Sequence, residues 1–505
     1  MRTAWLVTLG ALLSACIALP AVGQSAPPPP TDAAAPAPDP ADARWGTVRQ
    51  GRLPNGVRYV IVPRRSEDSG IGLYMRIEGG FIAEQRPGER GLAHLIEHLV
   101  FTSPTTGSPD DLYHFRHIGV PMSYPAPTAG TTTWDHSDYF MSTRTRDPQD
   151  IDTLLGLFRE AVSDLTLRAD AVDLERAEVV REMADKRPGN DIHADYIAAV
   201  APGSPNDVMD AQNSDDVPTA SIDTIRALYH RLYRPEHTMI VLVGDVDADR
   251  IEQLVERHFA RWTGMGAAAP LPPPPTIQAD RVQPVSHSAS GKRAIAMMTM
   301  ATPTPPTPRD PMAYARQRLM DAVVIQAVNT RLAAAFPGAS PGAAGMHIEQ
   351  GELGQRLIML WNGVTDGNWR PVIGAIKQLT CSLSRSGFTA AEWQAARAAV
   401  LETLRRDRDA MFAVTNIDIA RQFGAAATMG APVIPPDARH ALAEQWLPMI
   451  DHRAGHIWWR DQWNPRREHI RVESAALPAG DVDANAMIRA APDASPATPG
   501  CAVRG

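Results

Sequence analysis

Residues 90–101 read RGLAHLIEHLVF and form the most informative segment of this chain of 505 residues. Apolar residues recur in the segment at helical spacing, which predicts a helix over residues 92–101. His94 and His98 are four residues apart, so on a helix they share a face and can direct ring nitrogens at one metal ion. Glu97 borders that face, where a carboxylate can accept the proton of a metal-bound water without being a ligand.

The order H-x-x-E-H is the inverse of the H-E-x-x-H zinc signature. A catalytic zinc site needs a third protein ligand and an open fourth position. A second predicted helix, residues 171–186, carries Glu175 and Glu182 seven residues apart and therefore on one face. Glu182 can reach the metal with Glu175 behind it, whereas Glu178 faces elsewhere. This placement requires the helix to bury its apolar residues, Leu174, Val179 and Met183.

Both patterns also have a plainer interpretation. Two helix histidines can stand beside a glutamate by coincidence, and a glutamate pair at this spacing is usually a charged, solvated helix face. The glutamate pair therefore gains its value from the histidine motif that precedes it.

The composition excludes several classes of protein. Hydrophobic residues make up 44% of the chain and charged residues 21%, so the chain is neither disordered nor fibrous. The net charge of −8 argues against a nucleic-acid binder. Three cysteines are too few for a disulfide scaffold or a cysteine-built zinc cluster.

Residues 1–23 are predicted to be a signal peptide, with one positive charge, an apolar stretch and small residues before the cleavage point. We therefore expect export, to a periplasm. No later run approaches the roughly 18 apolar residues of a membrane span, so no transmembrane segment is expected. The alternative is a lipoprotein anchored through Cys16, because residues 13–16 resemble a lipobox.

Proline-rich tracts divide the rest of the chain. Residues 24–43 are predicted to be a spacer and residues 265–279 a linker between two domains, residues 44–264 and 280–483. Residues 484–505 are expected to form a flexible tail. Cys381 and Cys501 would pair there in an oxidising compartment or stay as two free thiols.

Both domains mix strands and helices, which suggests a duplicated unit. In the first, strands are predicted at 58–62, 72–77 and 237–246 and further helices at 151–165 and 249–262. In the second, strands are predicted at 293–300 and 357–361 and helices at 312–335, 369–386 and 390–410.

The chain resembles the M16 metallopeptidases, the inverzincins that include pitrilysin, insulin-degrading enzyme and the mitochondrial processing peptidase, and among them the short bacterial exported members. The resemblance rests on five segments in order: residues 53–57 (LPNGV), 90–101, 175–182 (ERAEVVRE), 233–237 (YRPEH) and 243–246 (VGDV). It implies an α+β fold, LuxS-like, of two similar domains, each a mainly antiparallel sheet flanked by helices.

The resemblance also implies roles for single residues. His94, His98 and Glu182 would bind one zinc ion per chain, Glu97 would be the general base, and Glu175 would orient the site from behind the ligands. The second domain would be inactive. The expected function is that of a zinc-dependent endopeptidase acting on extended peptides or unfolded segments, as a homodimer or a heterodimer with another M16 chain. The alternative is a non-catalytic or regulatory subunit of a two-chain M16 peptidase.

The sequence departs from the family in three places. The interval from His98 to Glu182 is longer than usual. Residues 128–136 (TAGTTTWDH) lack the family's substrate-binding asparagine, which leaves Thr128 and Ala129 as substrate-binding candidates and His136 as an ordinary strand histidine. Residues 331–350 lack the arginine–tyrosine pair that clamps substrate in many active members. Arg331 alone does not replace that pair and is expected on a helix surface.

Overall fold

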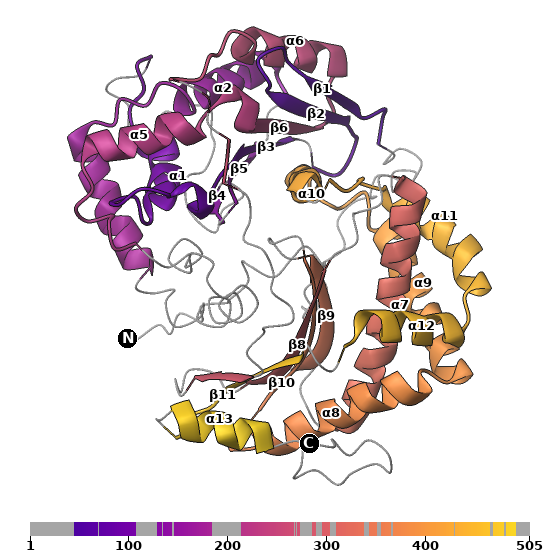
Figure 1. The fold of residues 1–505 in the computed structure, drawn as a ribbon. Coiled ribbons are helices and arrows are strands. Elements are labelled where there is room, and N and C mark those ends of the chain that lie inside the picture. The colour runs from indigo at the N-terminus through magenta and orange to yellow at the C-terminus, as the bar shows by residue number, and fades with distance from the viewer. Residues whose placement is uncertain are drawn as a thin grey trace, which may run out of the picture.

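The computed structural model describes residues 45–107, 129–183 and 214–272, with gaps at 69, 134, 144–145, 267 and 269, and residues 285–490 with several short gaps. Two sheets, each with its own helices, occupy separate halves of the molecule (Figure 1). No helix among the described residues is both long enough and apolar enough to cross a bilayer.

The N-terminal half contains a six-stranded sheet in the order β1-β2-β6-β3-β5-β4. Of its neighbouring pairs only β2–β6 is parallel. Strand β4 forms one edge. The strands are β1 (Arg49–Arg52), β2 (Arg58–Pro63), β3 (Ile71–Glu78), β4 (Ala129–Thr132), β5 (His136–Thr143) and β6 (Thr238–Gly244).

The helices of this half are amphipathic or fully buried, and they pack on one face of the sheet. They are α1 (Leu92–Thr102), α2 (Pro148–Ala161), an unlabelled helix at residues 169–183, α5 (Ile222–Leu232) and α6 (Ala248–Phe259). The short helices η2 (Phe81–Ala83) and η4 (Pro235–His237) complete it.

The C-terminal half repeats this plan. Its five-stranded sheet has the order β7-β11-β8-β10-β9, again with one parallel pair, β7–β11. The order and directions equal those of β2-β6-β3-β5-β4. The strands are β7 (Val285–Ser288), β8 (Ile295–Pro303), β9 (Ala344–Gln350), β10 (Gln355–Gly363) and β11 (Glu468–Glu473).

Seven helices and one short turn of helix belong to this part of the sequence among the described residues, and all but α10 accompany the second sheet. They are α7 (Pro311–Ala335), α8 (Trp369–Ser386), α9 (Ala390–Asp409), α10 (Asn416–Thr428), α11 (Pro436–Trp446), η6 (Leu447–Met449), α12 (His452–Gln462) and α13 (Asp481–Ala490). The α+β class, with two similar and mainly antiparallel domains, is therefore confirmed.

Strand β3 is buried on both faces because both are covered by helices. Leu73 and Met75 point into the core formed with the N-terminal helices. Tyr74, on the other face, packs in a separate cluster with Ile417 and Phe423 of α10. Helix α10 belongs to the C-terminal part of the sequence but lies against the N-terminal sheet, as Figure 1 shows.

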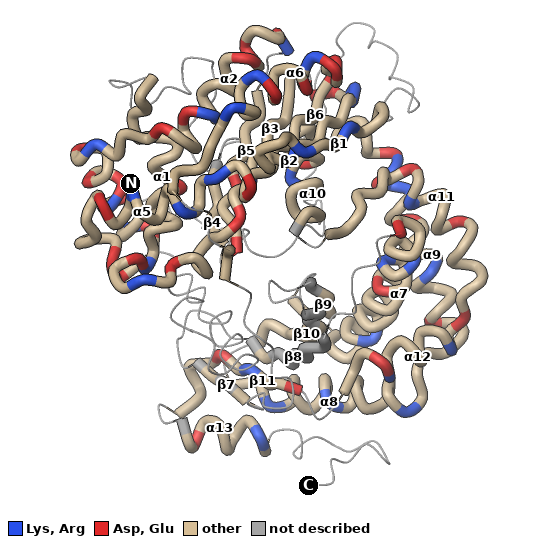
Figure 2. Tube along the Cα trace, turned by 45° about the horizontal axis from the view of Figure 1, so that its top comes forward, with Lys and Arg blue, Asp and Glu red and all other residues tan. Residues whose placement is uncertain are grey.

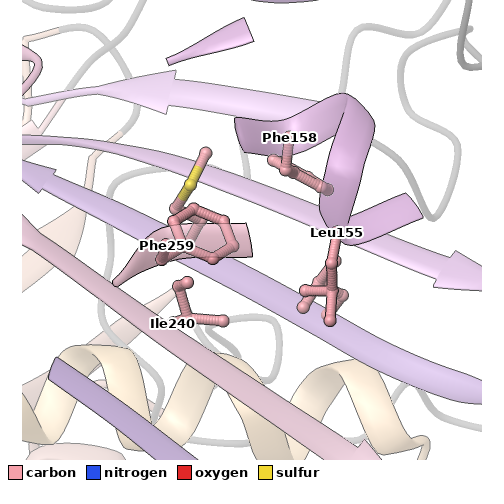
Figure 3. Close-up of a pocket in the computed structure, with 6 residues that line it drawn as sticks. Leu155, Phe158, Ile240 and Phe259 are labelled. Carbon is pink, nitrogen blue, oxygen red and sulfur yellow. The ribbon is translucent and has the colours of Figure 1, made fainter. Parts of the chain in front are cut away.

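An apolar gap lies inside the N-terminal core between the sheet and helices α2 and α6 (Figure 3). No polar side chain faces it. Its lining consists of Leu73, Met75, Leu155, Phe158, Ile240 and Phe259. Such a lining is that of a packed core and offers no group for binding or catalysis.

Two sequence-based expectations need correction or completion. Residues 484–490 are not a loose tail, because they belong to α13 and bury Ala484 and Ile488 completely. Cys381 on α8 is disulfide-bonded, and the other two cysteines of the sequence, Cys16 and Cys501, lie outside the described residues.

Acidic and basic residues are intermixed over the helices of both halves (Figure 2).

Candidate active site

Helix α1 begins at Leu92 because the preceding segment satisfies its first backbone amides. Gly91 has φ 84°, a left-handed conformation that suits glycine. The Glu84 carboxylate accepts hydrogen bonds from the amides of Gly91 (2.9 Å) and Ala93 (2.8 Å). Burial raises the pKa of Glu84 to about 8, against the lowering effect of these two bonds. The start of α1, and with it the register of the histidines, is therefore fixed by a buried side chain.

The structure brings together His94 and His98 of α1 and Glu182 of the helix at residues 169–183. One possible ligand atom from each lies within 4.8 Å of the others. Glu182 Oε2 is 3.3 Å from His98 Nε2 and 3.8 Å from His94 Nε2. His94 is buried, and the other two side chains are half-buried, so solvent can reach the cluster.

Glu175 lies one layer behind this cluster. Its Oε2 is 2.9 Å from His98 Nδ1, so it orients the ring and directs Nε2 toward Glu182. Burial alone would lower the pKa of His98, but the bonds to Glu175 and Glu182 and the nearby charge of Glu97 raise it to about 10. The three carboxylates around His98 thus form an electrostatic environment that favours a positive charge.

This donor set fits a zinc ion. Zinc binds imidazole nitrogens and carboxylate oxygens at about 2.0–2.2 Å in tetrahedral geometry, so that neighbouring ligand atoms lie roughly 3.3 Å apart. The two distances from Glu182 to the imidazoles are close to this value. The three side chains could therefore hold zinc with small movements.

Glu97 is buried beside the edge strand β4. Thr132 Oγ1 donates a hydrogen bond of 2.8 Å to Glu97 Oε2. A Cβ atom on Gly130 would lie 2.4 Å from Glu97 Oε1, so only glycine allows this approach. Sequence reasoning missed both residues and assigned substrate contacts to their neighbours Thr128 and Ala129. Thr128 lies outside the described residues, and Ala129 is the first residue of β4.

Three other sequence-based expectations meet the structure here. His136 lies apart from the metal-ligand cluster and contacts Asp135 (2.6 Å) and Asp138 (3.3 Å). Arg331 lies on a helix, α7, as expected, where it is half-buried and forms an ion pair with Glu392. Leu174 is 52% exposed, so the expectation that it is buried was wrong, whereas the other two apolar residues of its helix, Val179 and Met183, are buried.

Comparison of the sequence with models of known families identifies the class of protein to which this fold and these side chains belong. The model for "Insulinase (Peptidase family M16)" matches residues 59–199, and that for "Peptidase M16 inactive domain" matches residues 219–400. The chain belongs to peptidase family M16. The second match starts within the N-terminal half, because α5, β6 and α6 of that half follow residue 219.

Among curated relatives, the chain is 25% identical over 227 residues to "Probable zinc protease PqqL" of Escherichia coli K12, covering 43% of this chain and 23% of the relative. It is 24% identical over 210 residues to "Zinc protease PqqE" of Helicobacter pylori, covering 41% and 45%. These matches thus span less than half the length of either relative.

Solved structures show the same fold. The periplasmic protease PqqL from Escherichia coli superposes with a TM-score of 0.73 at 17% identity, over 90% of this chain and 51% of that chain. Its first half alone gives a TM-score of 0.73 at 17% identity, over 88% of this chain and 97% of that one. This chain is therefore similar in fold to the first half of a larger protease.

Proposed function

We propose that the chain is a zinc-dependent endopeptidase that cuts extended peptides or unfolded protein segments. His94, His98 and Glu182 hold one zinc ion, Glu97 is the general base, and Glu175 orients His98. The observation that carries this proposal is the meeting of two imidazoles from α1 with the Glu182 carboxylate, which lies more than 80 positions later in the chain. The zinc-protease names of the curated relatives support it.

A bound zinc ion would supply Lewis-acid polarisation of the scissile carbonyl and would acidify a water molecule. Glu97 accepts the proton of the attacking water and passes it to the leaving amine. Thr132 holds one oxygen of that carboxylate in place. Glu175 keeps the His98 ring oriented, so that Nε2 faces the ligand cluster.

Strand β4 is the proposed docking edge for the substrate. It is the last strand of its sheet and reaches the site, since Gly130 and Thr132 touch Glu97. An extended peptide that pairs with its outer edge is held by backbone hydrogen bonds, and selectivity for side chains is then broad. Ala129 would take part through its backbone, and Thr128 remains a candidate from the sequence.

Assembly and location are part of the same proposal. This chain spans about half of the Escherichia coli PqqL chain, so a second M16 half, in a homodimer or a heterodimer, would complete the enclosure around a substrate. Residues 1–23 would direct export to the periplasm, with lipid anchoring through Cys16 as the alternative. The similar structure from Escherichia coli is described as periplasmic.

The decisive experiment compares wild type with Glu97→Gln on an internally quenched, unstructured peptide. We expect about one zinc per chain by metal analysis, chelator-sensitive cutting, and a loss of kcat of at least ~100-fold in Glu97→Gln with zinc retained. Glu178→Gln is the matched control, because Glu178 is exposed and pairs with Arg181. Full activity of Glu97→Gln would refute the assigned mechanism.

The second candidate is a non-catalytic or regulatory subunit. It is favoured by the match of residues 219–400 to an inactive M16 domain and by the missing arginine–tyrosine pair at residues 331–350. In that case the purified chain would bind zinc without cutting, and cutting would appear only when a second M16 chain is added.

A further inference from the structure

The side chain that holds Glu97 belongs to a short series of hydrogen-bonded hydroxyl groups. Thr132 Oγ1, the donor to Glu97, lies 3.1 Å from Ser137 Oγ on the neighbouring strand β5. Tyr233, which follows α5, and Tyr139 lie close by, and their hydroxyl groups are hydrogen-bonded to each other. Ser137, Tyr139 and Tyr233 are each at most 3% exposed.

The carboxylate fixes the direction of every bond in this series. An ionised carboxylate only accepts, so Thr132 must give Glu97 its single hydroxyl proton. The Thr132 oxygen can then only accept, which makes Ser137 its donor. Both protons thus point toward Glu97, and bonds aligned in this way strengthen one another.

The tyrosines next to the hydroxyl series are buried and tightly packed. Burial raises the pKa of both Tyr139 and Tyr233 well above the usual range, and the charge of Glu97 adds to the effect. The Tyr233 ring packs against Tyr229, with ring centroids 4.9 Å apart. The Tyr139 ring packs against Phe101 of α1, with centroids 5.6 Å apart. Thr132 and Ser137 therefore lie beside rigid, buried groups.

We propose that this series positions the Glu97 carboxylate for proton transfer, an inference that rests on the proposed function. We call it the hydroxyl chain, and it consists of Thr132 and Ser137. These are positioning residues, since they act through Glu97.

The test replaces the terminal donor. Thr132→Val keeps the shape of the side chain and removes the donor, whereas Thr132→Ser keeps the hydroxyl. We expect Thr132→Val to lower kcat on a quenched peptide by on the order of 10-fold or more, with KM within about twofold and zinc content unchanged. Thr132→Ser should restore most of the rate, and Ser137→Ala should cost only about two- to fivefold.

Two comparisons separate positioning from a general loss of structure. Thr153→Val is the matched control, because the Thr153 hydroxyl donates only to the Gln149 carbonyl within α2 (3.0 Å), and it should leave kcat unchanged. In a Glu97→Gln background, Thr132→Val should lower the residual rate by less than about twofold, because a residue that acts through Glu97 has nothing left to position.

Several results would overturn the inference: wild-type kcat in Thr132→Val, loss of zinc in that variant, or an undiminished effect of Thr132→Val in the Glu97→Gln background. A zinc-loaded wild type that cuts no peptide refutes the proposed function instead. Crystal structures of wild type and Thr132→Val then decide the inference, which requires the Glu97 carboxylate to move or lose order in the variant. An identical carboxylate position would count against the hydroxyl chain.

Discussion

At the scale of single residues, Gly130 sets how closely strand β4 approaches the Glu97 carboxylate. A Cβ atom there would lie 2.4 Å from Oε1 and 2.7 Å from Cγ of Glu97. Real Cβ atoms do not tolerate such distances, so the glutamate would have to leave its place beside Thr132. The glycine therefore serves the geometry of the base and not a turn, since it lies inside a strand.

We predict that Gly130→Ala lowers kcat by between ~10-fold and the full loss seen in Glu97→Gln, while zinc stays bound. The reason is displacement of the base without a change in the ligand residues. Steady-state kinetics and metal analysis check this. Gly363→Ala is the control, because that strand residue has only one neighbouring atom within 4 Å of an added Cβ, at 3.6 Å. Unchanged kcat in Gly130→Ala would contradict the close approach.

His136 belongs to a buried charged cluster that includes Arg76, Asp135 and Asp138. Burial and Arg76 would lower the pKa of His136, but the two aspartates outweigh them and raise it from 6.5 to about 9. Because the folded protein binds this proton more tightly than the unfolded chain, the cluster's stabilisation is complete below pH 6.5. It is lost as the pH rises through 9.

We therefore expect the free energy of unfolding to fall by up to on the order of 3 kcal/mol from this group as the pH rises from about 6.5 to above 9. Urea unfolding at a series of pH values measures it. His136→Gln should flatten this part of the profile, whereas His452→Gln, at the start of α12, should leave it as in wild type. A profile that is the same in wild type and His136→Gln would show that the cluster does not depend on the proton.

At the scale of elements, the helix at residues 169–183 carries both carboxylates that face the histidines. Glu175 holds His98 Nδ1 while Glu182 faces the Nε2 atoms.

We predict that Glu175→Gln weakens zinc binding by roughly 10–100-fold, because an amide orients and polarises the imidazole less well than a carboxylate. Competition with a chromophoric chelator measures the affinity. Glu178→Gln should bind zinc as wild type does, and equal affinities for all three proteins would exclude this role for Glu175.

Elements whose own sequence carries their pattern could be predicted. Helix α8 was expected at residues 369–386 and is observed there, and α1 and β3 were within one residue of their observed ends. The meeting of α1 with the Glu182 helix was predicted from two sequence motifs, H-x-x-E-H at residues 94–98 and ERAEVVRE at residues 175–182. Thr132 and Ser137 could not be identified, because hydroxyl residues are common and only the pairing of β4 with β5 brings them to Glu97.

At the scale of the whole molecule, the two halves share a strand order but use one helix contact differently. Helix α7 follows β8 as α1 follows β3, and α9 is the second helix after β10 as the Glu182 helix is the second after β5. In the second half this pair of helices carries an ion pair instead, formed by Arg331 near the end of α7 and Glu392 at the start of α9, 2.8 Å apart. Within the described residues no second group of this ligand type occurs.

Helix α10 joins the C-terminal part of the chain to the N-terminal sheet through Asn416, which is fully buried. Its Oδ1 accepts a hydrogen bond from Arg64 (2.9 Å), and its Nδ2 donates to the Gly70 carbonyl (2.9 Å). Its backbone amide donates to Asp68 (2.9 Å). The Gly72 backbone lies so close to Asn416 that a Cβ would meet it at 2.4 Å. This contact lies on the sheet face opposite α2 and α6. Because α10 belongs to the C-terminal part of the chain, the contact couples the two halves.

We predict that Asn416→Ala lowers the free energy of unfolding by about 2–3 kcal/mol, because it leaves the buried Arg64 guanidinium and the Gly70 carbonyl without this partner. If the contact is the main coupling between the halves, the urea transition should also split into two steps, since each half keeps its own core. Asn485→Ala is the control, because Asn485 is a half-buried residue of α13. It should lower the free energy of unfolding by less than about 1 kcal/mol and leave a single urea transition. A single unshifted transition in Asn416→Ala would mean that other contacts hold the halves together.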